Sequence, residues 1–110
     1  MANVFETFAS ASLGTALTAV GSHTCAGSTT ETVIGLTVSN RTASAVKVDI
    51  TYHNGSTDFF IVKDAPVASG GALTPIGGDQ KIVLTTGDSI TVFEVTASSV
   101  DAVMSMLQIT

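Results

Sequence analysis

Few residues in this sequence have side chains that could carry out chemistry. His23 and His53 are the only imidazoles, and Cys25 is the only cysteine. A histidine can act as a general base or bind a metal, but His23 has no carboxylate close to it in the sequence. His53 lies on the polar side of a predicted strand, so we interpret it as a solvated or interfacial residue. Cys25 is interpreted as a small buried or half-buried thiol, and a lone cysteine allows neither an intrachain disulfide nor a cysteine-based zinc site.

Three aspartates stand beside glycine or just before proline, at Asp64, Asp79 and Asp88. A calcium loop needs several carboxylates within a dozen residues, and these are single. We therefore interpret each as a turn-forming residue. The sequence also lacks the G-x-S-x-G motif that exposes a serine nucleophile. It predicts no catalytic, cofactor-binding or metal-ligating residue and no enzymatic activity.

Composition limits the partners that this chain could bind. The formal net charge is −5, and the four Lys and Arg residues are scattered singly, which argues against nucleic-acid binding. Charged residues make up only 12% of the 110 residues, whereas Ser and Thr number 29. A surface so poor in charge resembles the centre of a protein interface, so we expect an assembly subunit.

Length and hydropathy bound the architecture and the location of the protein. A chain of 110 residues is the size of one domain, which we assign to residues 1–110. The first eight residues lack the features of a secretory signal, and no apolar run is long enough to span a bilayer. We expect a protein that is made in the cytoplasm and does not enter a membrane.

The most regular stretch, residues 46–53, alternates apolar and polar residues. This pattern predicts a strand with Val46, Val48, Ile50 and Tyr52 facing inward. An Asn-Gly pair follows directly, and both residues of such a pair tolerate positive φ. The pair therefore predicts a tight hairpin to a returning strand at residues 57–63.

Glycine and proline mark the limits of the neighbouring strands. Residues 32–40 are predicted to form a strand with Ile34, Leu36 and Val38 on one face. Gly35 within it indicates a bulge or a close approach of a neighbour. Pro66 is predicted to end the pairing of the returning strand, because proline has no N–H to donate. Glycine turns then separate three short strands near residues 72–75, 80–84 and 89–96.

The N-terminal region leaves three alternatives open, because its apolar spacing fits neither a helix nor a strand for long. The first is a pair of short strands at 4–11 and 15–20. The second is a short helix at 5–13. The third is an extended arm, residues 1–12, that docks on a neighbouring subunit.

At the C-terminal end, residues 102–110 alternate as a strand. Met104 and Met106 lie on the face opposite Val103 and Leu107. The two methionines form either a second core layer or an adaptable contact patch, since methionine suits both roles.

Strands about every ten residues, with no convincing helix, predict an all-β fold. We expect an antiparallel β-sandwich of eight or nine short strands, of jelly-roll or immunoglobulin-like type. The Cys–Trp–Cys spacing of true immunoglobulin domains is missing, because the chain has one cysteine and no tryptophan. Both topologies remain compatible with the pattern.

Five segments carry a likeness to a known group of proteins. They are TVIGLTVSN at 32–40, VKVDI at 46–50, IVKDAPV at 61–67, GGDQKIVL at 77–84 with the following Gly87-Asp88, and SSVDAVMS at 98–105. Together they resemble small all-β virion structural proteins of tailed bacteriophages, especially those of cyanobacterial and marine hosts. The likeness covers roughly residues 4–110 and consists of strands and turns, so it implies no functional residue.

The resemblance implies a non-enzymatic protein present in many copies on a virion, after synthesis in the host cytoplasm. The expected function is that of a capsid decoration (cement) protein that binds and stabilises the head shell. Its expected partners are copies of itself, as a trimer or higher oligomer, and the major capsid protein or other virion proteins. A neck, tail or baseplate accessory protein is the alternative. A receptor- or carbohydrate-binding module is disfavoured, because one Tyr and no Trp leave little to stack on a sugar ring.

Overall fold

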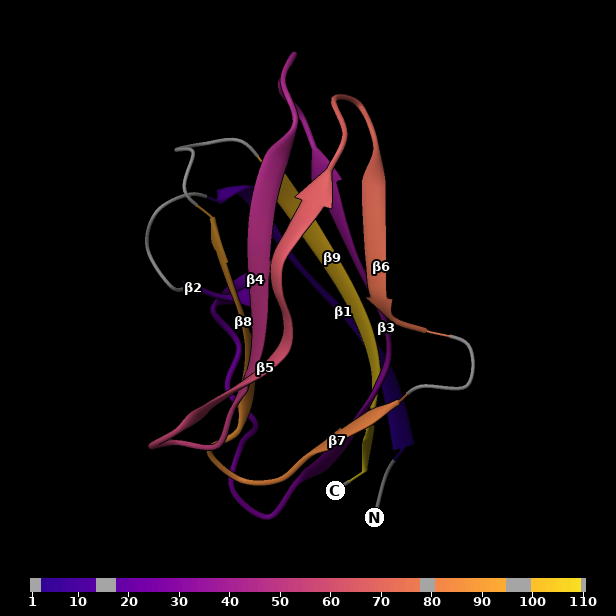
Figure 1. Ribbon diagram of the computed structural model, residues 1–110. Helices are drawn as coiled ribbons and strands as arrows, with labels where there is room; N and C mark the ends of the chain where they lie inside the picture. Colours follow the sequence, from indigo (N-terminus) through magenta and orange to yellow (C-terminus); the bar gives the residue numbers. More distant parts are fainter. Residues whose placement is uncertain (1–2, 14–17, 78–80, 95–99, 110) are drawn as a thin grey trace.

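The computed structural model describes residues 3–13, 18–77, 81–94 and 100–109. These residues form strands joined by turns and one short 3-10 segment, as Figure 1 shows. The elements are β1 (Asn3–Leu13), β2 (Thr18–Ala19), η1 (Val20–Ser22), β3 (Thr30–Asn40), β4 (Val46–His53), β5 (Asp58–Val67), β6 (Ala72–Ile76), β7 (Ile82–Leu84), β8 (Ser89–Glu94) and β9 (Val100–Ile109).

The strands build two antiparallel sheets that pack face to face (Figure 1). Sheet 1 has the order β1-β9-β3-β6, with β7 also pairing with β3, and sheet 2 has the order β2-β8-β4-β5. The first strand pairs with the last, the second with the next to last, and β4 with β5, as in one long hairpin that has been rolled up. The predicted all-β sandwich is confirmed, and the pairing is that of a jelly roll.

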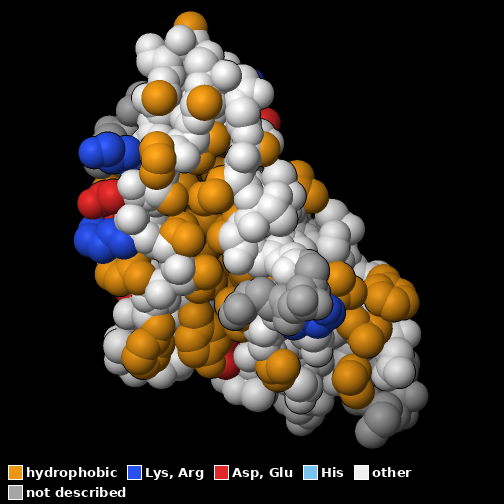
Figure 2. Space-filling view, turned by 45° about the vertical axis from the view of Figure 1, so that its right-hand side comes forward, with side chains coloured by type: hydrophobic (Ala, Val, Ile, Leu, Met, Phe, Trp, Pro, Cys, Tyr) orange, Lys and Arg blue, Asp and Glu red, His pale blue; other side chains and the backbone are white. Residues whose placement is uncertain are grey.

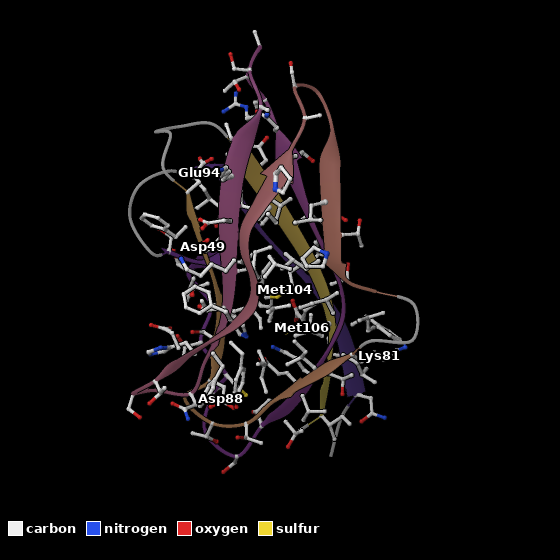
Figure 3. All side chains as sticks on the ribbon, viewed as in Figure 1. Asp49, Lys81, Asp88, Glu94, Met104 and Met106 are labelled. Carbon is white, nitrogen blue, oxygen red and sulfur yellow. The ribbon has the colours of Figure 1, made fainter. Side chains whose placement is uncertain are left out.

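The core fills the space between the two sheets. Its largest members come from β3, β4, β6, β7, β8 and β9. Met104 and Met106 point from β9 into this space (Figure 3) and are 1% and 0% exposed. The methionines therefore belong to the core, and the interpretation as a contact patch is wrong. Val103, on the opposite side of β9, is 47% exposed.

A β-bulge changes which residues of β3 face the core. Val33 pairs with Met106 and Gly35 with Ser105, so two steps along β3 match one step along β9. An extra residue reverses the alternation. Glu31 and Val33 are buried before the bulge, and Leu36, Val38 and Asn40 after it. Gly35 does mark a bulge, but Ile34 does not share the core face with Leu36 and Val38.

A hairpin joins β4 and β5 at the predicted place, but its turn comprises residues 54–57, because His53 pairs with Asp58. Gly55 has φ of 96°, and the side-chain oxygen of Asn54 accepts hydrogen bonds from the backbone N–H groups of Ser56 and Thr57, at 3.2 and 2.9 Å. These bonds close the turn without help from the rest of the molecule. The hairpin is a local property of the sequence.

Pro66 does not end the pairing of β5, contrary to the prediction. Lys47 pairs with Pro66 and Val46 with Val67, so the strand continues to Val67. Proline is tolerated here because β5 is an edge strand, whose outer side needs no ladder hydrogen bonds. Two register shifts along β5 accompany this, and Asp64, with φ of 52°, lies in one of them.

The N-terminal residues form an edge strand of sheet 1. Residues 3–13 run antiparallel to β9 of the same chain, so the predicted helix at 5–13 is wrong and a strand takes its place. The arm predicted at residues 1–12 lies, as far as it is described, along its own sandwich. Of the second predicted strand, 15–20, residues 18–19 form β2 and Val20 begins η1, while 15–17 lie outside the described residues.

Candidate interaction surface

The two histidines each bind a carboxylate. His53 Nδ1 lies 2.8 Å from Asp58 Oδ1, across the β4–β5 pair, and both side chains are about one-third exposed. His23 Nε2 lies 2.8 Å from both carboxylate oxygens of Glu31. His53 is thus half-exposed, as predicted. His23 has a carboxylate partner that its sequence neighbourhood did not reveal.

Glu31 is the centre of a buried polar cluster at one end of the sandwich. It is 0% exposed and also accepts a hydrogen bond of 2.6 Å from Gln108 Nε2 on β9. The Phe8 ring of β1 stacks on His23, with ring centroids 3.9 Å apart. A buried carboxylate is tolerated only when it is well hydrogen-bonded, so these contacts hold three strands together rather than leave a reactive group.

Asp88 organises the turn before β8, at the lower end of the view in Figure 3. Its Oδ2 accepts hydrogen bonds from Tyr52 Oη at 2.6 Å, Thr85 N at 3.0 Å and Thr85 Oγ1 at 3.1 Å. Burial raises the pKa of Asp88, whereas the hydrogen bonds from Tyr52 and Thr85 lower it. The hydrogen bonds together outweigh burial, so the pKa lies below its usual 3.8. The hydrogen bond to Asp88, and then burial, raise the pKa of Tyr52 above 10.0. Asp88 is a turn residue, as predicted.

Cys25 lies in the core, 3% exposed, with its sulfur 3.3 Å from the Thr29 carbonyl oxygen. Burial, followed by the nearby carboxylates of Glu31 and Asp88, raises the pKa of the thiol from 9.0 to about 11. The thiolate is the reactive form, so this cysteine is inert in the folded chain. The prediction of a small buried thiol is confirmed.

Asp64 lies within β5, so its interpretation as a turn residue is wrong. The backbone N–H of Asp64 donates to Asp49 Oδ1 at 2.7 Å, and Lys63 Nζ lies 3.7 Å from Asp49 Oδ2. Asp79 lies outside the described residues.

Within the described part of the chain, no three His, Cys, Asp or Glu side chains could share a metal ion, and no pocket is present. No helix of the described residues is long and apolar enough to cross a bilayer.

The outward side of sheet 1 offers a surface of a different kind. Phe5, Leu107, Thr32 and Val83 lie side by side across four strands, since each pairs with its neighbour in the sheet. Phe5 is 75% exposed and Val83 54%. We call this surface the neutral face and define it by Phe5, Thr7, Ala9, Thr32, Thr37, Val83, Val103, Ser105 and Leu107.

Charge is nearly missing from this side of the sheet. The described strands of sheet 1 contain three charged residues. Glu31 is buried, and Glu6 pairs with the core residue Met106 and so lies on the inward side. Asp101 lies at one end of the outward side, with its Oδ2 3.7 Å from Arg41 Nε. The centre of the neutral face consists of hydroxyl, methyl and aromatic groups.

The outward side of sheet 2 contrasts with the neutral face. The hydroxyls of Thr51 and Thr91 hydrogen-bond to each other across β4 and β8. Lys63 Nζ lies 5.0 Å from the centroid of the Phe60 ring, in addition to its contact with Asp49. The charged and polar groups on this side of sheet 2 are thus engaged with one another, and Thr51, Thr91 and Asp49 are buried.

A third surface follows the seam where β5 and β6 face each other. Figure 2 shows hydrophobic side chains running along this side of the sandwich. Half-buried apolar residues of the two strands pack here against the core: Ile61, Val62, Ala65 and Leu73. They close the core at the seam, so they have a packing role that the neutral face lacks.

Comparison with known proteins gives a likeness of fold. No protein-family model matches the sequence, and no curated protein matches it either. Among solved structures, a chain from Bacillus endospore appendages, described as a novel family of disulfide-linked pili, superposes with a TM-score of 0.58 at 12% identity. The match covers 98% of this chain and 88% of that chain. The two chains therefore share the β-sandwich fold.

Proposed function

We propose that this protein is a non-enzymatic structural subunit that works in many copies, attached to one another and to a larger particle. The observation that carries the proposal is the neutral face. It is a sheet surface without charge at its centre, with Phe5 75% and Val83 54% exposed. Free monomers cover such surfaces with Lys and Glu, whereas the centres of interfaces are depleted in both.

Side-chain chemistry supports adhesion of this kind. Short hydroxyl and methyl side chains lose little rotamer entropy when they are ordered at a contact. The neutral face is built largely from such residues, among them Thr7, Thr37 and Ser105. The fold shared with an appendage protein described as forming pili also fits a role in assembly, although likeness at 12% identity concerns the fold alone.

The particle we propose is a bacteriophage virion, with decoration of the capsid shell as the role and the major capsid protein as the partner. The resemblance of the strand and turn segments carries this finer proposal. A neck, tail or baseplate position is the alternative, and the copy number separates the two. Hundreds of copies per particle, counted by mass spectrometry of purified virions, indicate the head, whereas about a dozen indicate the neck or baseplate.

Placing one charge on the neutral face tests the assembly proposal. Val103→Lys puts an ammonium at its centre, and because Val103 is 47% exposed the fold should tolerate it. Ala43→Lys, in the exposed loop after β3, is the matched control. Light scattering and electron microscopy should show that Val103→Lys no longer assembles and that Ala43→Lys still does. The Val103→Lys subunits should bind one another at least ~10-fold more weakly than wild-type subunits. Equal assembly by both variants would remove the neutral face from the proposal.

A further inference from the structure

The sheet edges differ greatly in how open they are to another strand. An edge strand presents unpaired N–H and C=O groups, and natural proteins protect such edges with prolines, lysines, bulges or short length. Sheet 2 ends in β2, of two residues, and in β5, which carries two bulges, Lys63 and Pro66. Sheet 1 ends on one side in β6, of five residues with Pro75, and the three-residue β7.

β1 differs from all of these edges. It runs for 11 residues, contains no proline, glycine or lysine, and has no register shift between Asn3 and Ser10. Within the described chain it is therefore the one long edge that lacks protection. A strand of this kind is a template for pairing with another chain.

The open part of β1 is its first half. The η1 segment packs beside the second half, because Gly21 N donates to Ser10 Oγ at 2.7 Å. A Cβ at Gly21 would come within 2.7 Å of Phe8 Cβ, so the two segments are in tight contact. In the first half, Asn3 and Thr7 are exposed, and Val4 and Phe5 are 42% and 75% exposed.

The same stretch of a second copy is the strand that fits this edge best. It offers an equally open row of backbone groups, whereas the other edges are short or protected. Two identical strands related by a two-fold axis pair antiparallel. With the axis at Phe5, Glu6 lies opposite Val4 of the second copy, and Thr7 lies opposite Asn3. In this antiparallel pair the two Glu6 carboxylates are not opposite each other. In a parallel pair in register they would be, and their like charges would disfavour that arrangement.

We propose that residues 3–7 of β1 pair antiparallel with the same residues of a second copy, with the two Phe5 rings side by side at the two-fold axis. The pair joins sheet 1 of both copies into one continuous sheet, and the two neutral faces become one surface. The inference rests on the proposed function in taking a second copy as the partner. It goes further in naming the edge, the direction and the register.

Disulfide trapping tests the register directly. Phe5→Cys places two thiols at the axis, where directly opposed Cβ atoms lie about 4.5–5.5 Å apart. Cys25 is buried and does not compete. Phe60→Cys, on the β5 edge, is the control, with Phe60 54% exposed against 75% for Phe5. With diamide as oxidant, Phe5→Cys should give a covalent dimer at least ~10-fold faster than Phe60→Cys.

A second variant measures the association without cross-linking. Phe5→Glu places two carboxylates at the axis and should shift the dimer to monomer in sedimentation experiments. Its melting temperature should equal that of the wild type in dilute solution, where both are monomeric. The proposal is overturned if the wild type stays monomeric at millimolar concentration, if Phe5→Glu still dimerises, or if Phe5→Cys cross-links no faster than Phe60→Cys. Assembly that Val103→Lys abolishes but Phe5→Glu leaves intact would overturn the β1 pairing and leave the proposed function standing.

Discussion

Removing the hydroxyl of Tyr52 should destabilise the fold in a pH-dependent way. Tyr52→Phe keeps the ring, and with it the stack on Phe59, whose centroid lies 6.1 Å away. The variant loses only the 2.6 Å hydrogen bond to Asp88, a carboxylate that is 4% exposed. A hydrogen bond to a charged group contributes about 1.5–3 kcal/mol.

The loss should fall at the lower end of that range. Thr85 still supplies two donors to Asp88 Oδ2, and Tyr52 is only half-buried, so water can replace part of the lost bond. We expect the free energy of unfolding to fall by about 1.5 kcal/mol near neutral pH, and the melting temperature by about 5 °C. Urea denaturation followed by circular dichroism measures the first quantity, and calorimetry the second.

The sign of the pH dependence follows from the two pKa shifts. The pKa of Asp88 is lowered in the folded state, so Asp88 contributes to the free energy of unfolding above pH 3.8. This contribution is lost as the pH falls through the folded-state pKa. The pKa of Tyr52 is raised in the folded state, so Tyr52 contributes to the free energy of unfolding below pH 10.0. This contribution is lost as the pH rises through the folded-state pKa. The difference in the free energy of unfolding between wild type and Tyr52→Phe should therefore narrow as the pH falls below 3.8 and as it rises above 10.0.

A double-mutant cycle separates this bond from the rest of the turn. Asp88→Asn and the double variant complete the cycle, and the coupling energy should be about 1 kcal/mol or more. A loss below about 0.5 kcal/mol, or an equal loss at every pH, would refute the reasoning. Either result would mean that the Tyr52 hydroxyl is solvated in the folded protein.

Two further predictions concern the core. Met104→Ala should lower the free energy of unfolding by about 3 kcal/mol, because the side chain is 1% exposed, whereas Val103→Ala on the other side of β9 should cost less than about 1 kcal/mol. If the two variants lowered the free energy of unfolding by similar amounts in denaturant melts, Met104 would not lie on the buried side of β9 as the structure has it. The thiol of Cys25, with its pKa of about 11, should react with a thiol reagent at pH ~8 at least ~100-fold more slowly in the folded than in the urea-unfolded protein. Rapid labelling of the folded protein would show that the loop around Cys25 opens.

Features that depend on neighbouring residues were predictable from the sequence. The strand at residues 46–53, the Asn-Gly hairpin and the turn at Asp88 each rest on local periodicity or on hydrogen bonds within a few residues. Glycine turns separated the strands correctly, because each turn is specified by the residues that form it.

Features that depend on sequence-distant partners were not predictable in the same way. The partner of His23 is Glu31, whose second donor, Gln108, lies 77 residues further along the chain. Pro66 can stay in its strand because β5 is at an edge, and edge position is a property of the sheet. A helix at 5–13 was an open alternative until β9 provided the partner that makes this segment a strand.

The sequence by itself determined that the chain alternates in strands, that tight turns join them, and that little charge is available for the surface. Tertiary structure decided which residues of β3 are buried, since one bulge at Gly35 reverses the alternation along that strand. It also decided that the neutral face and the first half of β1 are exposed in the described part of the chain. The reason is that burial and pairing are set by contacts between strands far apart in the chain, which local periodicity does not encode.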